Sequence, residues 1–196
     1  MLCNPQNYKI MSSNKQSLKT SLTDLINLKN LKTAFKFWED RTYQEKCIAV
    51  LYFKSNADQK APVPVYGLKE FCEFFTTLRF HPEYIHQLAA IREEGRAIFN
   101  ESFLNQLQRF QFRFDLNALP EGYLVSDADA LLCLYASKIE LKIIEYALLN
   151  IYSEQNSAEG YKFELKISAS NTDILPALND NNFIEICREG KMLYFF

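Results

Sequence analysis

The sequence is poor in the residues from which most ligand cradles and catalytic sites are built. It has 196 residues, but only five glycines, two histidines and one tryptophan. The glycines stand far apart, so neighbouring residues cannot form a Gly-rich loop that holds a nucleotide phosphate. The Gly-x-Ser-x-Gly motif of serine hydrolases is also missing. We therefore expect one α+β domain that carries no complete catalytic site of its own.

The cysteines are odd in number and lack the spacing of a metal site. No Cys-x-x-Cys pair occurs, which argues against a zinc ribbon, and an odd count argues against a disulfide framework. We expect reduced, mostly buried thiols, as in cytosolic proteins. The five cysteines are Cys3, Cys47, Cys72, Cys133 and Cys187.

Neither charge nor long apolar runs point to nucleic acid or membranes. The net charge is -2 and the pI is near 5.8, without the basic excess of a dedicated nucleic-acid binder or a membrane-surface protein. No apolar run approaches the roughly 20 residues that cross a bilayer. The polar N-terminus lacks an apolar core of signal-peptide length. The sequence therefore predicts a cytoplasmic protein with no nucleic-acid or membrane partner.

What the sequence does contain is material for a core, with 48% hydrophobic and 14% aromatic residues. Residues 1–20 are polar and are predicted to be a flexible lead-in. Apolar spacing predicts helices over 22–39, 68–78, 82–91, 99–110 and 139–152, and strands over 47–53, 123–125, 131–135 and 161–167. In the tail, 173–178 is a possible short helix, and 183–187 is a possible partner of 192–196.

Two further patterns affect the predicted strands. Phe110, Phe112 and Phe114 alternate with polar residues, which predicts a strand with one aromatic face. Pro62 and Pro64 are expected to interrupt the chain, because proline lacks a backbone N–H.

Several residues with suitable chemistry are more simply explained by structure. His81 and His86 are five positions apart, so a helix does not bring them to one face for a metal. Asp127 and Asp129 offer oxygen ligands for Mg²⁺, but turns favour aspartate for backbone bonding. The aromatic run 109–114 lacks the glycines of an RNA-binding strand. Glu140 and Glu145 do not align as a carboxylate pair, and structural roles are expected.

A set of short segments, in a fixed order, resembles the nicotinate phosphoribosyltransferase family. The set consists of a Phe-Leu…Leu…Phe helix, a Pro-Glu-Gly turn, a Leu-Leu strand and a helix with a Leu-Leu-Asn signature. These segments are 103–110, 119–125, 131–134 and 144–151. Upstream, Thr23-Asp24-Leu25, Leu51-Tyr52-Phe53-Lys54 and Tyr66-Gly67-Leu68 also match family motifs. The resemblance extends over about residues 21–155.

The resemblance implies an α+β fold in which helices pack on a small, mostly antiparallel sheet. That is the N-terminal domain of nicotinate and quinolinate phosphoribosyltransferases, here followed by a short βαββ-like tail. It implies three parts: a lead-in (1–20), the α+β domain (21–155) and a divergent extension packed on it (156–196). Family members make nicotinate mononucleotide from nicotinate and phosphoribosyl pyrophosphate, with ATP and Mg²⁺. Their catalytic histidine and phosphate loops belong to a barrel, which residues 153–196 are too few to form.

By resemblance alone, Thr23, Asp24, Ile26 and Lys54 face the substrate. Ile26 stands where the family has an aromatic residue against the nicotinate ring. Lys54 stands where the family has an arginine, and a lysine does not bind an anion in the same bidentate way. No catalytic residue, metal site or cofactor is expected for this chain alone.

Three functions remain open from the sequence. The first is a non-catalytic binding or regulatory relative linked to NAD salvage, which forms a homodimer or docks on a barrel-containing phosphoribosyltransferase. The second is one half of a split nicotinate phosphoribosyltransferase that acts with a separate barrel chain. The third is a domain reused for an unrelated protein interaction.

Overall fold

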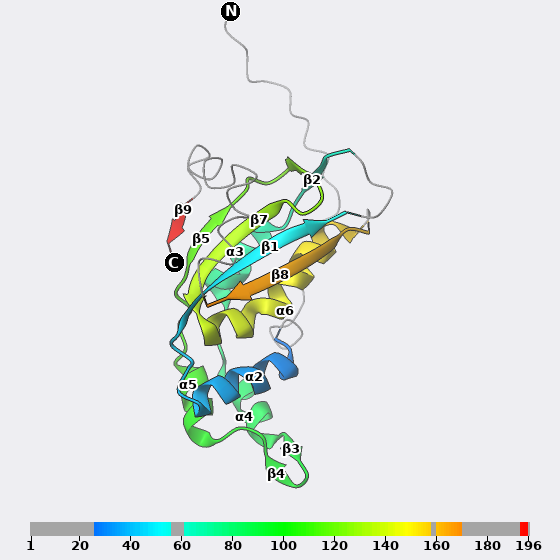
Figure 1. Ribbon diagram of the computed structural model, residues 1–196. Coiled ribbons are helices and arrows are strands. Elements are labelled where there is room, and N and C mark those ends of the chain that lie inside the picture. Colours follow the sequence, from blue (N-terminus) through cyan, green and yellow to red (C-terminus); the bar gives the residue numbers. More distant parts are fainter. Residues whose placement is uncertain (1–25, 56–60, 158–159, 170–192, 196) are drawn as a thin grey trace, which may run out of the picture.

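The computed structural model describes residues 26–55, 61–157, 160–169 and 193–195. The order of helices and strands follows the colours of Figure 1. The helices are α2 (Leu28–Glu39), α3 (Leu68–Thr77), α4 (Pro82–Ala90), α5 (Glu101–Gln108) and α6 (Lys138–Gln155). The strands are β1 (Lys46–Lys54), β2 (Val63–Val65), β3 (Arg92–Glu93), β4 (Arg96–Ala97), β5 (Asp115–Ala118), β6 (Tyr123–Val125), β7 (Ala130–Ser137), β8 (Lys162–Ser168) and β9 (Leu193–Phe195).

A five-stranded sheet in the order β8-β1-β7-β5-β9 organises the fold, and each neighbouring pair is antiparallel (Figure 1). Two further antiparallel pairs are separate from this sheet. The strands β2 and β6 have three residues each, and β3 and β4 have two each. The predicted extension, 156–196, supplies β8 at one edge of the large sheet and β9 at the other. The extension is therefore part of the same sheet as the predicted domain.

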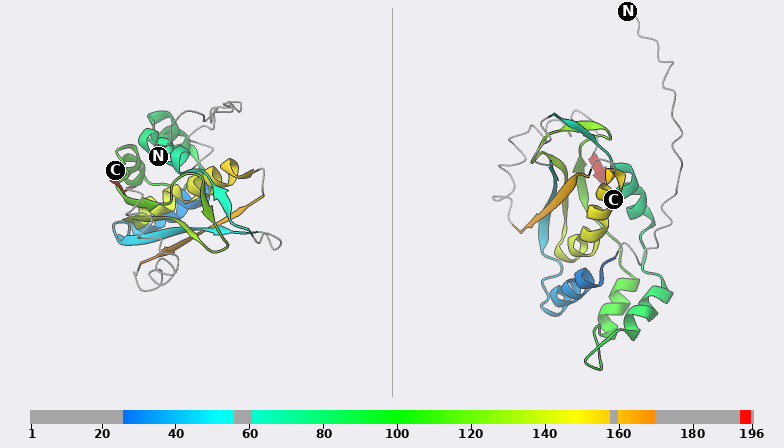
Figure 2. Two further views of the ribbon diagram at one scale, coloured as in Figure 1. Left: turned by 90° about the horizontal axis from the view of Figure 1, so that it is seen from above. Right: turned by 90° about the vertical axis from the view of Figure 1, so that its right-hand side faces the viewer.

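Helices α6 and α3 lie on one side of this sheet, whereas no helix of the described residues lies on the other (Figure 2). Because side chains alternate along a strand, one face of β1 and β7 carries apolar residues that meet α6. These side chains are almost completely buried, and they include Ala49, Leu51, Phe53, Leu132 and Leu134. This face supplies much of the core.

Helices α2, α4 and α5 and the β3–β4 hairpin lie beyond one end of the sheet (Figure 1). Aromatic rings join α2 to α5 there. The ring centroids of Phe35 and Phe103 are 5.0 Å apart, and these two rings are tilted to each other. The ring centroids of Phe35 and Phe99 are 5.6 Å apart, and these two rings meet edge to face. Both helices therefore belong to the same hydrophobic core as the sheet.

The α+β class and the helices expected in the described residues are confirmed, but α2, which corresponds to the helix predicted over 22–39, does not include Ile26 and Asn27. It begins at Leu28, because Asn27 is extended and its side chain accepts a hydrogen bond from the Lys29 N–H at 2.8 Å. Ile26 thus precedes the helix. The predicted segments 173–178 and 183–187 lie outside the described residues, and β9 pairs with β5.

The strand predicted over 110–114 is wrong. Its phenylalanines do alternate inward, but β5 begins only at Asp115. The reason is Glu140, whose carboxylate accepts a hydrogen bond from the Arg113 N–H at 2.7 Å. The same carboxylate accepts the Ser137 N–H in the capping box that starts α6. The Glu140 carboxylate therefore accepts the Arg113 N–H in place of a β7 carbonyl, and the pairing of β5 with β7 begins only at Asp115.

The expected interruption at the prolines is also wrong in part. Pro64 lies within β2, opposite Leu124 of β6, and its side chain is exposed. Proline is tolerated here because β2 belongs to a two-stranded pair, where one side of the strand needs no ladder bond.

Replacing Glu140 tests its double role. Glu140 is 6% exposed, and its loss leaves the N–H groups of Arg113 and Ser137 without their acceptor. We expect Glu140→Ala to lower the free energy of unfolding by about 3 kcal/mol, measured by urea denaturation. The control is Glu73→Ala, an exposed residue 3.9 Å from Lys69, which should change it by less than about 0.5 kcal/mol. Equal effects of the two changes would refute the role of Glu140.

Candidate functional site

The predicted substrate-facing residues do not form one cluster in the described part of the chain. Thr23 and Asp24 lie outside the described residues. Ile26 is 4% exposed and belongs to the hydrophobic core. Lys54 ends β1 and is half-exposed. Ile26 is apolar and buried, so of these two residues only Lys54 offers a polar group at the surface.

Lys54 lies on the face of the sheet that points away from α6. Its Nζ atom is 3.4 Å from a carboxylate oxygen of Glu164 on β8. Lys162 is the direct cross-strand neighbour of Lys54, and Tyr52 is that of Glu164. On the same face, the ammonium group of Lys166 lies 5.0 Å from the centre of the Tyr52 ring. Lys54 thus forms an ion pair with Glu164 on the adjacent strand, on a face that also carries Lys162 and Lys166.

A tyrosine and a cysteine of β1 and a cysteine of α3 hold their protons at neutral pH. Burial, followed by the nearby Cys133 and Glu164, raises the pKa of the Tyr52 phenol. Burial also raises the pKa of the Cys47 thiol. On α3, burial and then Glu121 raise the pKa of the Cys72 thiol to about 11. Thiolate is the nucleophilic form of cysteine, so neither Cys47 nor Cys72 is activated.

The aspartates and histidines singled out in the sequence have local roles. Asp127 accepts a hydrogen bond from the Ser55 N–H at 2.8 Å, and this bond lowers the pKa of its carboxyl group. Asp129 accepts the Ser126 N–H at 2.7 Å within the same turn. His81 and His86 are both exposed, as expected for residues at the start and outer side of α4.

The fit of these groups to a metal can be judged from the donors. Within 26–55, 61–157 and 160–169, no three His, Cys, Asp or Glu side chains gather as ligands would. The two aspartates of the 126–129 turn already accept backbone N–H groups. Both carboxylates of this turn are therefore engaged by backbone donors.

The motifs that carry the family resemblance converge on a structural junction at the start of α3. Glu121, of the Pro-Glu-Gly turn, directs its carboxylate at the first N–H groups of this helix. Its oxygens accept the Gly67 N–H at 3.2 Å and the Lys69 N–H at 2.7 Å. A carboxylate is favoured here by the unpaired N–H groups and the positive end of the helix dipole.

Asn156 completes the junction from the end of α6. Its amide exchanges two hydrogen bonds with the backbone of Tyr66, accepting at 3.1 Å and donating at 2.7 Å. Gly67 has φ of 129° and lies directly against Tyr152. Three segments far apart in sequence are thereby held together at Gly67, and these motifs serve the fold.

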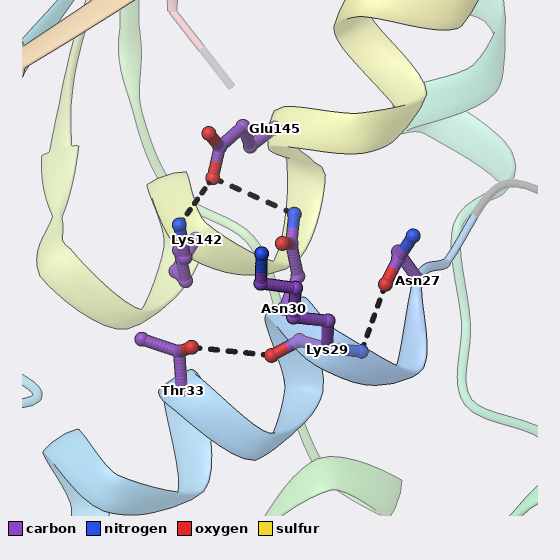
Figure 3. Close-up of polar contacts among 6 residues, drawn as sticks. All are labelled: Asn27, Lys29, Asn30, Thr33, Lys142 and Glu145. Carbon is purple, nitrogen blue, oxygen red and sulfur yellow. Dashed lines mark hydrogen bonds and ion pairs between the residues drawn. The ribbon is translucent and has the colours of Figure 1, made fainter.

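A second polar group joins α2 to α6 (Figure 3). The Glu145 carboxylate is 2.6 Å from the Lys142 ammonium group and receives a longer hydrogen bond, 3.5 Å, from the Asn30 amide. Asn30 is almost fully buried on α2. The balanced charges and the buried amide position the two helices, as expected for Glu145.

A groove lies between the end of α3 and the extended segment 110–114. Its volume is about 440 Å³, within the range of small-molecule sites. The residues that line it include Phe75, Arg79, Gln111, Phe112, Arg113 and Phe114. Sequence reasoning did not single out this groove. The alternating phenylalanines were a signal for its floor, but nothing in the sequence brings Arg79 beside them.

The crystal structure of human nicotinic acid phosphoribosyltransferase matches with a TM-score of 0.58 at 20% sequence identity, over 65% of this chain and 25% of that chain. This chain shares the fold of part of a nicotinate phosphoribosyltransferase. The family resemblance inferred from the motifs is thus confirmed at the level of fold. No family model and no curated protein matches the sequence.

The chain spans about a quarter of the length of the human enzyme, and at this identity the likeness concerns the fold. In the part of the chain that the structure describes, no helix has both the length and the apolarity needed to cross a membrane.

Proposed function

We propose that this chain is a non-catalytic binding or regulatory relative of the nicotinate phosphoribosyltransferase N-terminal domain, linked to NAD salvage. The observation that carries the proposal is the fold match to one quarter of the human enzyme. On this proposal, the described elements act as a partner domain for a chain that carries the barrel.

The chemistry at the predicted ligand positions supports a non-catalytic role. Lys54 is engaged by Glu164, and Ile26 is buried in the core. The thiols of Cys47 and Cys72 are protonated at neutral pH. Phosphoribosyl transfer requires groups that stabilise the charge of pyrophosphate, and Lys54 already forms an ion pair with Glu164. On this proposal, Mg²⁺, ATP and phosphoribosyl pyrophosphate bind to the partner.

The proposed partner is a barrel-containing phosphoribosyltransferase chain in the cytoplasm. Sedimentation velocity of the full chain mixed with a complete nicotinate phosphoribosyltransferase from the same organism tests this association. We expect a complex at micromolar concentrations and a changed rate of nicotinate mononucleotide formation. Separate sedimentation of the two proteins, or self-association of this chain without enzyme binding, would contradict the proposed partner.

Mixing with an isolated barrel protein separates the regulatory role from a split enzyme. A regulatory relative should leave the inactive barrel inactive. Restored turnover would replace the proposal with the split enzyme, in which this chain is one half of the catalyst.

A further inference from the structure

We infer that strand β8 joins two copies of this chain into a symmetric dimer, by pairing antiparallel with β8 of the second copy. The large sheets of the two copies then form one continuous sheet, with the twofold axis at Leu165. This inference goes beyond the proposed function, because it concerns self-association and needs no phosphoribosyltransferase chain.

Strand β8 is a regular strand at one edge of the five-stranded sheet (Figure 1). It pairs with β1 over seven residue pairs without a bulge, and none of the described strands pairs with its outer side. Its sequence contains neither proline nor glycine. Such an edge presents backbone N–H and C=O groups to a further strand, and strand addition is a common mode of protein recognition.

The charges of β8 make this strand complementary to itself in one antiparallel register. Lys162, Glu164 and Lys166 are exposed on the face of the sheet that points away from α6. When Leu165 lies opposite Leu165 of the second copy, Glu164 of each chain lies opposite Lys166 of the other. Opposite charges at directly opposed positions stabilise a strand pair, and the dimer has two such pairs.

The same charges disfavour the neighbouring registers. A slide of two residues in one direction sets Glu164 opposite itself and Lys162 opposite Lys166, and a slide in the other direction sets Lys166 opposite itself. Like charges at directly opposed positions destabilise a strand pair. Lysines on an edge strand therefore usually prevent pairing between copies. In β8 the glutamate between two lysines leaves one register in which the charges support pairing.

The apolar side chains of β8 meet in this same register. Phe163 lies opposite Ile167 of the second copy, and Leu165 lies opposite itself. Ile167 is 39% exposed in the single chain, and Phe163 and Leu165 are partly exposed. Pairing of the two edges removes part of this apolar surface from water, which is favourable. The charged face and the apolar face of β8 therefore select one and the same pairing.

Sedimentation velocity of the full chain, over a range of concentrations, tests the dimer. Two seven-residue edges form a small interface, so we expect a dissociation constant of roughly 10–100 µM. Glu164→Lys and Lys166→Glu each create two pairs of like charges across the interface, and each should weaken association at least about tenfold. Lys46→Glu is the matched control, because it makes the same charge change on the same face but on β1. It should leave the affinity within about twofold.

Mixing the two single variants tests the register itself. A Glu164→Lys chain opposite a Lys166→Glu chain regains both pairs of opposite charge, so the mixture should associate about as tightly as the unmodified chain. The double variant, with both changes in one chain, should do the same. Both positions are exposed, and thermal melting checks that each variant is folded.

Three results would each overturn the β8 dimer. The first is a full chain that stays monomeric up to about 500 µM. The second is self-association of both single variants as tight as that of the unmodified chain, which would place the contact elsewhere. The third is failure of both the mixture and the double variant to associate.

Discussion

Deleting residues 161–196 should cause aggregation or abolish cooperative unfolding. The deletion removes β8, which pairs with β1 over seven residue pairs, and β9, which pairs with β5. It also uncovers the Phe53 and Tyr152 rings, which contact Phe163 at centroid distances of 6.2 Å and 5.7 Å. Exposed sheet edges and apolar surface promote association. The lost contacts are comparable with the whole stability of a domain, about 5–15 kcal/mol.

The comparison uses a deletion at the other end of the chain. Removing residues 1–20, the predicted lead-in, should leave the melting temperature within about 2 °C of the full chain. Solubility and thermal melting of the two truncations, followed by circular dichroism, measure the difference. A chain that lacks 161–196 but melts like the full chain would show that β8 and β9 are dispensable.

Among Gly67, Gly95 and Gly122, replacement by alanine should destabilise the protein most at Gly67. The backbone at Gly67 has φ of 129°, which side-chain-bearing residues rarely adopt. An added Cβ would lie 3.2 Å from Cγ and 3.3 Å from Cα of Tyr152, a side chain fixed in the core. Strain and crowding together should lower the free energy of unfolding by about 3 kcal/mol, or roughly 10 °C in melting temperature.

Gly95→Ala is the matched control for crowding. Gly95 also has positive φ, 77°, but an added Cβ there meets nothing within 4 Å. Its replacement should therefore cost only the backbone strain, about 1 kcal/mol. If the two substitutions destabilise the protein equally, close contact with Tyr152 is not what makes Gly67 necessary.

The pattern of apolar residues within a short segment was enough to predict α3, α6 and β1. The apolar spacing of α3 and α6 suffices because each helix buries one side against the core, and the continuous apolar run of β1 suffices because this strand is buried on both faces. The error at 110–114 shows the limit of this reasoning. Alternating phenylalanines indicate an extended chain with one inner face, but whether it pairs depends on Glu140, which arrives from another element. Pro64 likewise needed knowledge that β2 has a free side.

The candidate sites depended even more on long-range arrangement. The Pro-Glu-Gly turn was visible in the sequence, yet only the fold brings Glu121 to the N–H groups of Gly67 and Lys69. The position of Lys54 at the end of a strand was predictable, but its partner Glu164 lies on a strand that follows four helices later. Arg79 and Arg113 meet in one groove through topology alone.

The central claim is that this chain carries the fold of a phosphoribosyltransferase segment without performing the reaction by itself. The most direct measurement is formation of nicotinate mononucleotide by the purified full chain, supplied with nicotinate, phosphoribosyl pyrophosphate, ATP and Mg²⁺. The proposal predicts no product above the background without protein. Sustained turnover by the chain alone, lost on Lys54→Ala, would contradict it and assign Lys54 a part in catalysis.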